Sequence, residues 1–376
     1  MQAYLDNSAT TPLCETAKQW MRRAMEDSWG NPSSLHEVGL RAQTLLDESR
    51  AAVAKALHCP EKDLLFTSGG TEANNLALFG AAQAQQKNGR RILVSAVEHP
   101  SVMKAAEQLS RAGFDVQQIP VDRFGVVAVK DVEALLDDNT ILVSVMAVNN
   151  ELGSIEPVQE IAALLKQKRS RALFHIDAVQ AFGKLPLFPG KLGCDLLTVS
   201  AHKIHGPKGA GALWIRPGVT IRPQLFGGEQ QNGLRPGTEP MVALAGFGGA
   251  ATRIAPEEHL PRVTALRDSF VSALRELPDV VVNSADNALP YIVNLALPHH
   301  PAEVVLNFLS DRGVFVSSGS ACAKGHRSPV LTAAGLDPAL VSSSLRVSLS
   351  AETTEAELQY CLDGIKAALE TIRRKG

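Results

Sequence analysis

The 376-residue sequence lacks the features that mark membrane, secreted and nucleic-acid-binding proteins. Its most apolar window, 241–251, is rich in alanine and glycine and far shorter than the ~20 residues that a membrane span needs. The N-terminus, MQAYLDNSATTP, has neither the basic region nor the apolar region of a signal peptide. A net charge of -2 provides no basic field for nucleic acid. We therefore expect no membrane association and no direct contact with nucleic acid.

Cysteine is also scarce. The five cysteines are dispersed and show neither CxxC pairs nor the spacing of metal ligands: Cys14, Cys59, Cys194, Cys322 and Cys361. An odd, dispersed set of this kind is typical of reduced thiols in the cytosol. The sequence therefore predicts a soluble cytoplasmic protein without a metal site.

Short apolar runs alternate with helical stretches through the first two-thirds of the chain. The runs predicted to be strands are 63–67, 91–96, 141–148, 172–177, 195–200 and 211–215. Stretches with helical spacing of apolar residues, among them 40–57, 71–86 and 158–170, separate most of them. This alternation predicts an α/β fold with a mostly parallel sheet covered by helices on both faces.

The pattern changes near residue 250. A helix over 261–277 leads into short strands at 291–297 and 346–350, which is an α+β pattern. We therefore expect a large domain over 13–255 and a smaller α+β domain over 256–376. The first 12 residues are assigned to the smaller domain, because chain termini often lie close together.

Chemically active side chains follow the ends of five predicted strands. In open α/β sheets, ligands bind beyond the carboxyl ends of the strands, so these side chains are expected to meet at one edge. The strand ends lead to Ser68-Gly69-Gly70-Thr71 before a helix, to Glu98-His99, to Asn149-Asn150-Glu151, to Asp177 with Gln180 one turn later, and to Ser200-Ala201-His202-Lys203. The backbone amides and hydroxyls at the helix start suit a phosphate group.

Each of these signals has a simpler interpretation when it is taken alone. The glycine turn is often only a turn, and His99 before a proline can be an ordinary loop histidine. Asp177 can cap the next helix, and Lys203 can extend its ammonium to solvent. The convergence of all of them on one sheet edge favours a single site.

Pyridoxal phosphate is the cofactor that these groups fit. It needs a lysine that binds its aldehyde, an acid beside the ring nitrogen and a phosphate site. Lys203 and Asp177 supply the first two, and Ser200 and His202 can reach the phosphate. His99 can stack on the ring, whose substituents can accept hydrogen bonds from two amides, Gln180 and Asn150.

Ten motifs, in order along nearly the whole chain, resemble one family, the NifS/IscS-like cysteine desulfurases of the class V aminotransferases. They are YLDNSATTP (4–12), NPSSLHEVG (31–39), FTSGGTEANNLAL (66–78), VEHPSV (97–102), VNNELGSI (148–155), HIDAVQAFGKLP (175–186), SAHKIHGPKG (200–209), GGEQQNGLRPGTE (227–239), SSGSAC (317–322) and SLRVSLS (344–350). The resemblance implies the fold of type I pyridoxal phosphate-dependent transferases, with a mostly parallel seven-stranded sheet.

The resemblance also implies a role for individual residues. The cofactor-binding lysine falls on Lys203, the acid on Asp177 and the ring-stacking histidine on His99, and the expected catalytic residues are Lys203, His99 and Cys322. Phosphate contacts fall on Gly70, Thr71, Ser200 and His202, and other cofactor contacts on Asn150 and Gln180. The threonine that reaches the phosphate of the neighbouring subunit falls on Thr238, which implies a homodimer with shared sites.

Cys322 is the predicted nucleophile. It lies in SSGSACAKGHRSP, a polar stretch whose Lys324, His326 and Arg327 favour the thiolate, whereas the other four cysteines lie in or beside apolar segments and are expected to be packed. Arg346, within an apolar run, is expected to clamp a carboxylate, and the resemblance assigns it to that of the substrate, with Asn150 beside it.

The implied reaction converts L-cysteine to L-alanine. Lys203 moves the Cα proton, and Cys322 takes the sulfur as a persulfide and passes it to an acceptor protein. The acceptor is either an iron–sulfur scaffold or a tRNA-thiolation enzyme, and the short C-terminal end after the last predicted helix leaves this choice open.

Other functions remain open on the same scaffold. They are a selenocysteine lyase, a cystine C–S lyase, another aminotransferase-type activity, or a sulfur carrier without catalysis. Cys322 argues against an ordinary aminotransferase, which needs no thiol at that position. Lys203, Asp177 and His99 together argue against a protein without chemistry.

Overall fold

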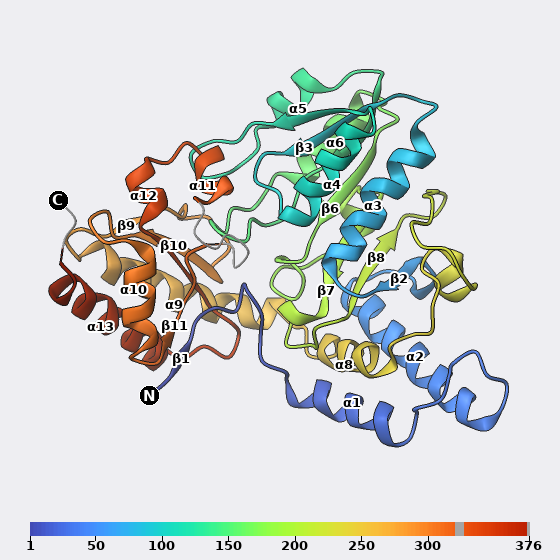
Figure 1. Ribbon diagram of the computed structural model, residues 1–376, viewed down its shortest axis with the longest axis horizontal. Helices are drawn as coiled ribbons and strands as arrows, with labels where there is room; N and C mark the ends of the chain where they lie inside the picture. Colours follow the sequence, from blue (N-terminus) through green and yellow to red (C-terminus); the bar gives the residue numbers. More distant parts are fainter. Residues whose placement is uncertain (320–326, 374–376) are drawn as a thin grey trace.

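Seven short strands form the central sheet of the protein in the computed structural model, which describes residues 1–319 and 327–373 (Figure 1). From one edge to the other the strands are β2 (Leu64–Thr67), β8 (Gly211–Ile215), β7 (Leu196–Ser200), β6 (Leu173–Asp177), β5 (Thr140–Ser144), β3 (Arg91–Ser95) and β4 (Asp115–Ile119). β8 is antiparallel to both of its neighbours, and the β7-β6-β5-β3-β4 pairings are all parallel. The predicted fold class, with its mostly parallel seven-stranded sheet, is confirmed.

Helices cover both faces of this sheet. One face packs against α3 (Gly70–Gln85) and α4 (Pro100–Arg111). The other face packs against α6 (Val158–Gln167) and α8 (Met241–Ala251), and α8 in turn contacts α1 (Glu15–Glu26) and α2 (Glu37–Ala56). Two short helices, α5 (Val129–Leu135) and α7 (Pro189–Leu192), lie between strands in the chain.

The apolar window at 241–251 is the buried helix α8. Its glycines allow close packing: a Cβ at Gly246 would lie 2.7 Å from the Met21 side chain, and one at Gly248 would lie 2.7 Å from Ser49. Helices α1 and α2 therefore approach α8 more closely than a residue with a side chain would permit.

The C-terminal third and the first residues build smaller sheets. An antiparallel sheet has the order β12 (Ser344–Ser348), β10 (Ile292–Ala296), β9 (Val281–Val282). β1 (Ala3–Tyr4) pairs in parallel with β11 (Val314–Phe315), so the N-terminus lies with the C-terminal part of the chain (Figure 1). The accompanying helices are α9 (Pro256–Arg275), α10 (Ala302–Ser310), α11 (Pro329–Ala333), α12 (Pro338–Ser342) and α13 (Glu355–Thr371).

Three elements show the clearest differences between the structure and the sequence-based expectation. Strand β4 was not predicted, because it is a half-exposed edge strand of sequence DVQQI and has no apolar run. Strand β5 ends at Ser144 instead of 148, although Val145 and Ala147 still donate backbone hydrogen bonds to β6. Helix α9 begins at Pro256, five residues before the predicted start, with proline in its first turn.

Three short 3₁₀ helices complete the described elements: η1 (Glu61–Asp63), η2 (Ala201–Lys203) and η3 (Gln230–Gly233). Across residues 1–319 and 327–373, no helix combines the length and the apolar character needed to cross a bilayer.

Candidate active site

A cavity of about 300 Å³ lies at the carboxyl ends of the parallel strands. Its lining includes ten residues that were predicted from the sequence to bind the cofactor or the substrate: Gly70, Thr71, His99, Asn150, Asp177, Gln180, Ser200, His202, Lys203 and Arg346. Thr238 is exposed and is not part of this lining, and Cys322 lies outside the described residues. The structure therefore brings most of the predicted set together around one space.

Asp177 ends β6 as a buried carboxylate. Its Oδ2 accepts a hydrogen bond from Asn74 Nδ2 at 2.7 Å, and its Oδ1 accepts one from the backbone N–H of Val179 at 3.0 Å. The contact with Val179 is the local hydrogen bond that a capping role for Asp177 predicts. Asp177 also lines the cavity, so capping is not its only contact. Because both donors are neutral, the negative charge can still be balanced by a cationic group in the cavity.

Lys203 ends η2 and is held by the N-terminal segment. Its Nζ donates to the backbone carbonyls of Ser8 and Ala9, the latter at 2.7 Å. The side chain is half-buried and lines the cavity, so it does not simply extend into solvent. Residues far apart in sequence thus place the lysine amine beside the strand ends.

The turn before α3 has the backbone geometry of an anion site. Gly69 has a φ of 151°, a conformation that favours glycine, and the helix begins at the next residue. A Cβ at Gly70 would lie 2.9 Å from Val179 Cγ2, so the close approach of these two segments also needs glycine.

Ser200 supplies an orphaned hydroxyl at the same place. Its Oγ is buried and has no hydrogen-bond partner within the described part of the chain. Buried hydroxyls without a partner are uncommon, and a ligand oxygen satisfies them. Together with the start of α3, this hydroxyl suits a phosphate group.

Burial favours the neutral form of two histidines of the cavity. His99 Nδ1 accepts a hydrogen bond from the backbone N–H of Ser101 at 3.1 Å, so the neutral ring carries its proton on Nε2. Burial lowers the pKa of His99, with opposing effects of Asp177 and Lys203. Burial, with Lys203 and other cations nearby, also lowers the pKa of His202 to about 4.

Arg346 is the cationic group of the C-terminal sheet at this cavity. It lies in β12, is only 1% exposed, and donates from Nη1 to the carbonyl of Asn150 at 2.9 Å. Its Nη2 forms an ion pair with Asp6 Oδ1 at 2.8 Å. Its Nε has no partner among residues 1–319 and 327–373, so the guanidinium retains donors for a further acceptor.

Sequence reasoning gave no role to several residues that hold the site in place: Asp6, Ser8, Asn74 and Ser101. Asp6 and Ser8 belong to the motif YLDNSATTP, whose spacing alone does not indicate what these side chains contact. Asn74 lies one turn into the helix that follows the glycine turn, and this spacing was the available signal.

Burial disfavours the thiolate form of three of the four described cysteines. Cys14, Cys194 and Cys361 are buried and Cys59 is half-buried. Burial raises the pKa of Cys59 and of Cys361 to about 12 each, and it also raises that of Cys194. These thiols are packed residues, as the sequence predicted.

The donor set fits pyridoxal phosphate. A lysine amine, a buried carboxylate, an orphaned hydroxyl beside a helix start, and neutral imidazoles surround one cavity. These are the partners that the aldehyde, the ring nitrogen and the phosphate of this cofactor need.

The comparisons with known proteins agree with this chemistry. The family model for class V aminotransferases matches residues 3–361. A cysteine desulfurase IscS from Dictyoglomus turgidum is 39% identical over 378 residues, which cover 99% of this chain and 95% of that protein.

Solved structures are similar over the same length. A NifS-like protein superposes with a TM-score of 0.94 at 35% identity, covering 99% of this chain and 100% of its own. A structure of SspA in complex with cysteine has a TM-score of 0.83 at 31% identity, covering 94% of this chain and 100% of its own.

Proposed function

Since the chain belongs to the class V aminotransferases and is a pyridoxal phosphate-dependent cysteine desulfurase, we propose which of its residues carry out the reaction. The cofactor, when bound, supplies an aldehyde that holds the substrate amine and a cationic ring that draws electrons from its Cα. The convergence of Lys203, Asp177 and Arg346 on one cavity carries the proposal.

The cofactor-binding roles follow from the position of each group. Lys203 would hold the aldehyde, and Asp177 would lie beside the ring nitrogen. Ser200, His202 and the amides of Gly70 and Thr71 would hold the phosphate. His99 would stack on the ring, and the amides of Gln180 and Asn150 would contact its substituents. The orphaned Ser200 hydroxyl and the neutral donors to Asp177 support this arrangement.

Lys203 and Arg346 act on the substrate. Arg346 binds the α-carboxylate of L-cysteine through the donors that Asp6 and Asn150 leave available. The Lys203 amine, near the carbonyls of Ser8 and Ala9, moves the proton at Cα. The similar SspA structure in complex with cysteine supports cysteine as the substrate.

Cys322, which lies outside the described residues, accepts the sulfur. Its thiolate attacks the substrate sulfur, so that a sulfur–sulfur bond forms and the bond from Cβ to sulfur breaks. The electron pair of the broken bond stays with the carbon fragment, which takes up a proton and becomes L-alanine. The persulfide sulfur then passes to an acceptor protein, an iron–sulfur scaffold or a tRNA-thiolation enzyme, in the cytoplasm. The free state of the described cysteines supports a reducing compartment.

The cofactor assignment is tested by locating the modified lysine. Purified holoenzyme is reduced with borohydride, digested and mapped by mass spectrometry, and the label is expected on Lys203. Lys203→Ala should lose the visible absorbance of the bound cofactor, whereas Lys208→Ala, a change at an exposed lysine nearby, should retain it. Label on Lys184 or Lys208 in the wild type would contradict the assignment.

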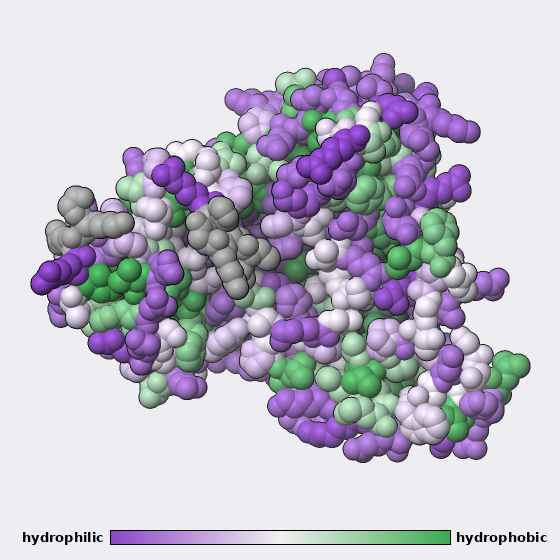
Figure 2. Space-filling model, in the orientation of Figure 1, coloured by the Kyte–Doolittle hydropathy of each residue, from purple (hydrophilic) through white to green (hydrophobic). Residues whose placement is uncertain are grey.

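A homodimer is proposed from the surface of the chain. Several large apolar side chains are exposed, with Leu35 at 103% and Phe226 at 87%, accompanied by Trp29 and Leu225. Hydrophobic residues interrupt the polar surface over the connection between α1 and α2 (Figure 2). Thr238 is also exposed, which suits a residue that completes the site of a partner chain.

Shared sites are tested by mixing variants. A Lys203→Ala chain mixed with a Thr238→Ala chain should form some sites that carry neither change, with recovery of activity and cofactor affinity. Mixed dimers without recovery would count against the sharing.

We also propose that residues 13–255 form the large cofactor-binding domain and that 1–12 with 256–376 form the small domain that carries Cys322. The pairing of β1 with β11, and the bridge between Asp6 and Ser348, support the assignment of the N-terminus.

A further inference from the structure

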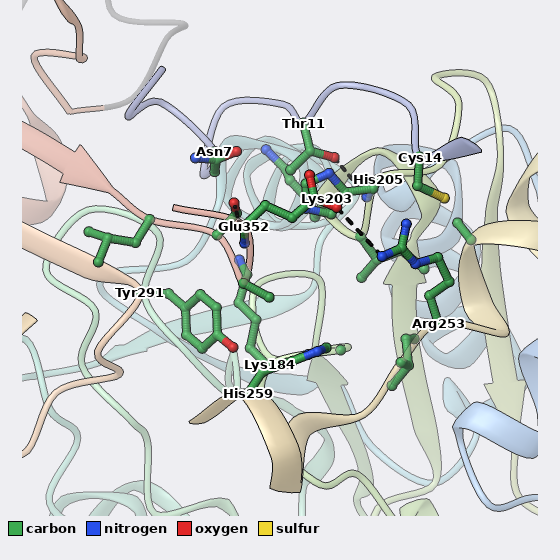
Figure 3. A pocket seen from close by; sticks show the side chains of 17 residues that line it. Asn7, Thr11, Cys14, Lys184, Lys203, His205, Arg253, His259, Tyr291 and Glu352 are labelled. Atoms are coloured by element: carbon green, nitrogen blue, oxygen red, sulfur yellow. Dashed lines mark hydrogen bonds and ion pairs between the residues drawn. The ribbon is translucent and has the colours of Figure 1, made fainter. Parts of the chain in front are cut away.

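A second cavity of about 170 Å³ is lined in part by Lys203 (Figure 3). Lys203 lines both cavities, and Gln180 lines only the larger one. Lys184 lines the second cavity and contacts Gln180, so this pair of side chains lies between the two spaces. Neither the sequence motifs nor the reaction gives Lys184 a role, although it is a buried lysine only 6% exposed.

The backbone after β6 places Gln180 and Lys184 together. Residues 178–185 form irregular helical turns, in which Phe182 N–H donates to the Ala178 carbonyl and Leu185 N–H donates to the Ala181 carbonyl. Side chains four residues apart lie on one face of such a turn. Lys184 Nζ accordingly donates to Gln180 Oε1 at 3.0 Å.

This contact helps to fix which way the Gln180 amide points, together with the contact of Gln180 Nε2 with the Ser8 carbonyl. A lysine ammonium has three donors and no acceptor, so the amide atom that faces it must be the oxygen. The amide nitrogen then faces the opposite direction, where Nε2 donates to the Ser8 carbonyl at 3.0 Å. One N–H of that NH₂ group is left for an acceptor in the larger cavity, which Gln180 lines.

The surroundings make the charge on Lys184 easy to lose. Burial, and then repulsion from Lys203 and Arg346, lower the pKa of Lys184 to about 7. The ring of Tyr291 lies 5.9 Å from Nζ, and its hydroxyl has no partner in the described chain. The other titratable or charged groups around this cavity come from separate elements: Cys14, His205, Arg253, His259 and Glu352.

A negative charge on the bound cofactor would favour the charged form of Lys184. Its ring hydroxyl can ionise, and an ionised oxygen near the Gln180 NH₂ group favours the ammonium form of Lys184 behind the amide. The ammonium and the ionised oxygen would therefore stabilise each other through Gln180.

We propose that Lys184 is a positioning residue that holds the Gln180 amide with its NH₂ group toward the cofactor ring and so strengthens cofactor binding. The inference rests on the proposed contact between Gln180 and the cofactor. It assigns a function to a buried cation that takes no direct part in the chemistry.

The test uses Lys184→Met, which removes the donor and keeps the length of the side chain. The cofactor dissociation constant, measured by absorbance titration of the apoprotein, should rise roughly tenfold, as expected for loss of a hydrogen bond to a charged group. The pH midpoint of the bound-cofactor absorbance should move to higher pH, because the ionised ring oxygen loses its support. Lys191→Met, at an exposed lysine in α7, serves as the matched control and should change neither value.

A double-mutant cycle separates positioning from other effects. If Lys184 acts through the amide, Lys184→Met should cause no further change in a Gln180→Ala background. An unreduced effect in that background, or no effect of Lys184→Met alone while the cofactor remains bound to Lys203, would overturn the inference. Absence of cofactor from Lys203 in the wild type would instead overturn the proposed function. Thermal unfolding of each apoprotein identifies variants that fail to fold. If Lys184→Met does not fold, Lys184→Gln takes its place in the test. Its side chain retains a donor, so this variant should keep most of the wild-type affinity for the cofactor.

Discussion

Replacing Arg346 with methionine removes the cation that we propose for the substrate carboxylate. The guanidinium is buried, and two of its N–H groups are engaged with Asn150 and Asp6. A bidentate carboxylate contact would use two of the remaining donors. Each hydrogen bond to a charged group contributes about 1.5 to 3 kcal/mol, so loss of both corresponds to roughly a 100-fold to 20,000-fold loss of affinity.

The assay compares L-cysteine with cysteamine, which has the same amine and thiol but no carboxylate. Binding is followed by the change in cofactor absorbance on titration with each compound. The wild type should prefer L-cysteine by the factor above, and Arg346→Met should bind both compounds with similar, weak affinity. Arg346→Lys should retain part of the preference, since a lysine keeps the charge but not the fork of donors.

Asp6 provides the control for folding. Removal of Arg346 leaves the Asp6 carboxylate without its ion-pair partner, and an unpaired charge can destabilise the fold independently of substrate binding. The Asp6→Asn/Arg346→Met double variant removes both charges and should show the same loss of preference with unfolding closer to that of the wild type. If either Arg346→Met form still preferred L-cysteine over cysteamine by the wild-type factor, the carboxylate assignment would be refuted.

Three further predictions concern the cofactor, pH and assembly. Asp177→Asn keeps the shape of the side chain and loses its charge, so alanine formation should fall about 100- to 1,000-fold in activity assays. The cofactor should stay bound, which its absorbance would show. Wild-type turnover would contradict the role of Asp177 beside the ring nitrogen. Burial raises the pKa of Glu156 to about 8, so this carboxyl stabilises the fold at low pH and that stabilisation is lost as pH rises through 8. Denaturant unfolding at pH 6 and pH 9 should therefore show a loss of roughly 2 to 3 kcal/mol in the wild type that Glu156→Gln lacks; equal losses would exclude Glu156 as the cause. Phe226→Asp should shift the proposed dimer to monomer in light scattering, and an unchanged mass would exclude that surface from the interface.

The sequence predicted the parts of the site that follow directly from strand ends. Asp177 and Lys203 come at or just after the carboxyl ends of buried parallel strands, and parallel pairing brings those ends to one edge. The edge strand β4 was not predicted, because its sequence DVQQI has glutamines where a buried strand would have apolar residues.

Residues that support the site through distant contacts could not be predicted in the same way. Asp6 reaches Arg346 from 340 positions away, and Asn74 reaches Asp177 from 103 positions away. Only the assembled fold reveals such pairs. Lys184 is a similar case, since its spacing from Gln180 is visible in the sequence but its burial is not.

The most direct test of the central claim locates the sulfur. Holoenzyme is incubated with L-cysteine, persulfides are trapped by alkylation, and the labelled peptide is identified by mass spectrometry while alanine is measured. The account predicts persulfide on Cys322 with an equal amount of alanine from the first turnover. It also predicts that Cys322→Ser keeps the cofactor and its spectral response to L-cysteine but yields neither product, because serine is a far weaker nucleophile toward sulfur. Persulfide on Cys14, Cys59, Cys194 or Cys361 instead, or full alanine production by Cys322→Ser, would contradict the account.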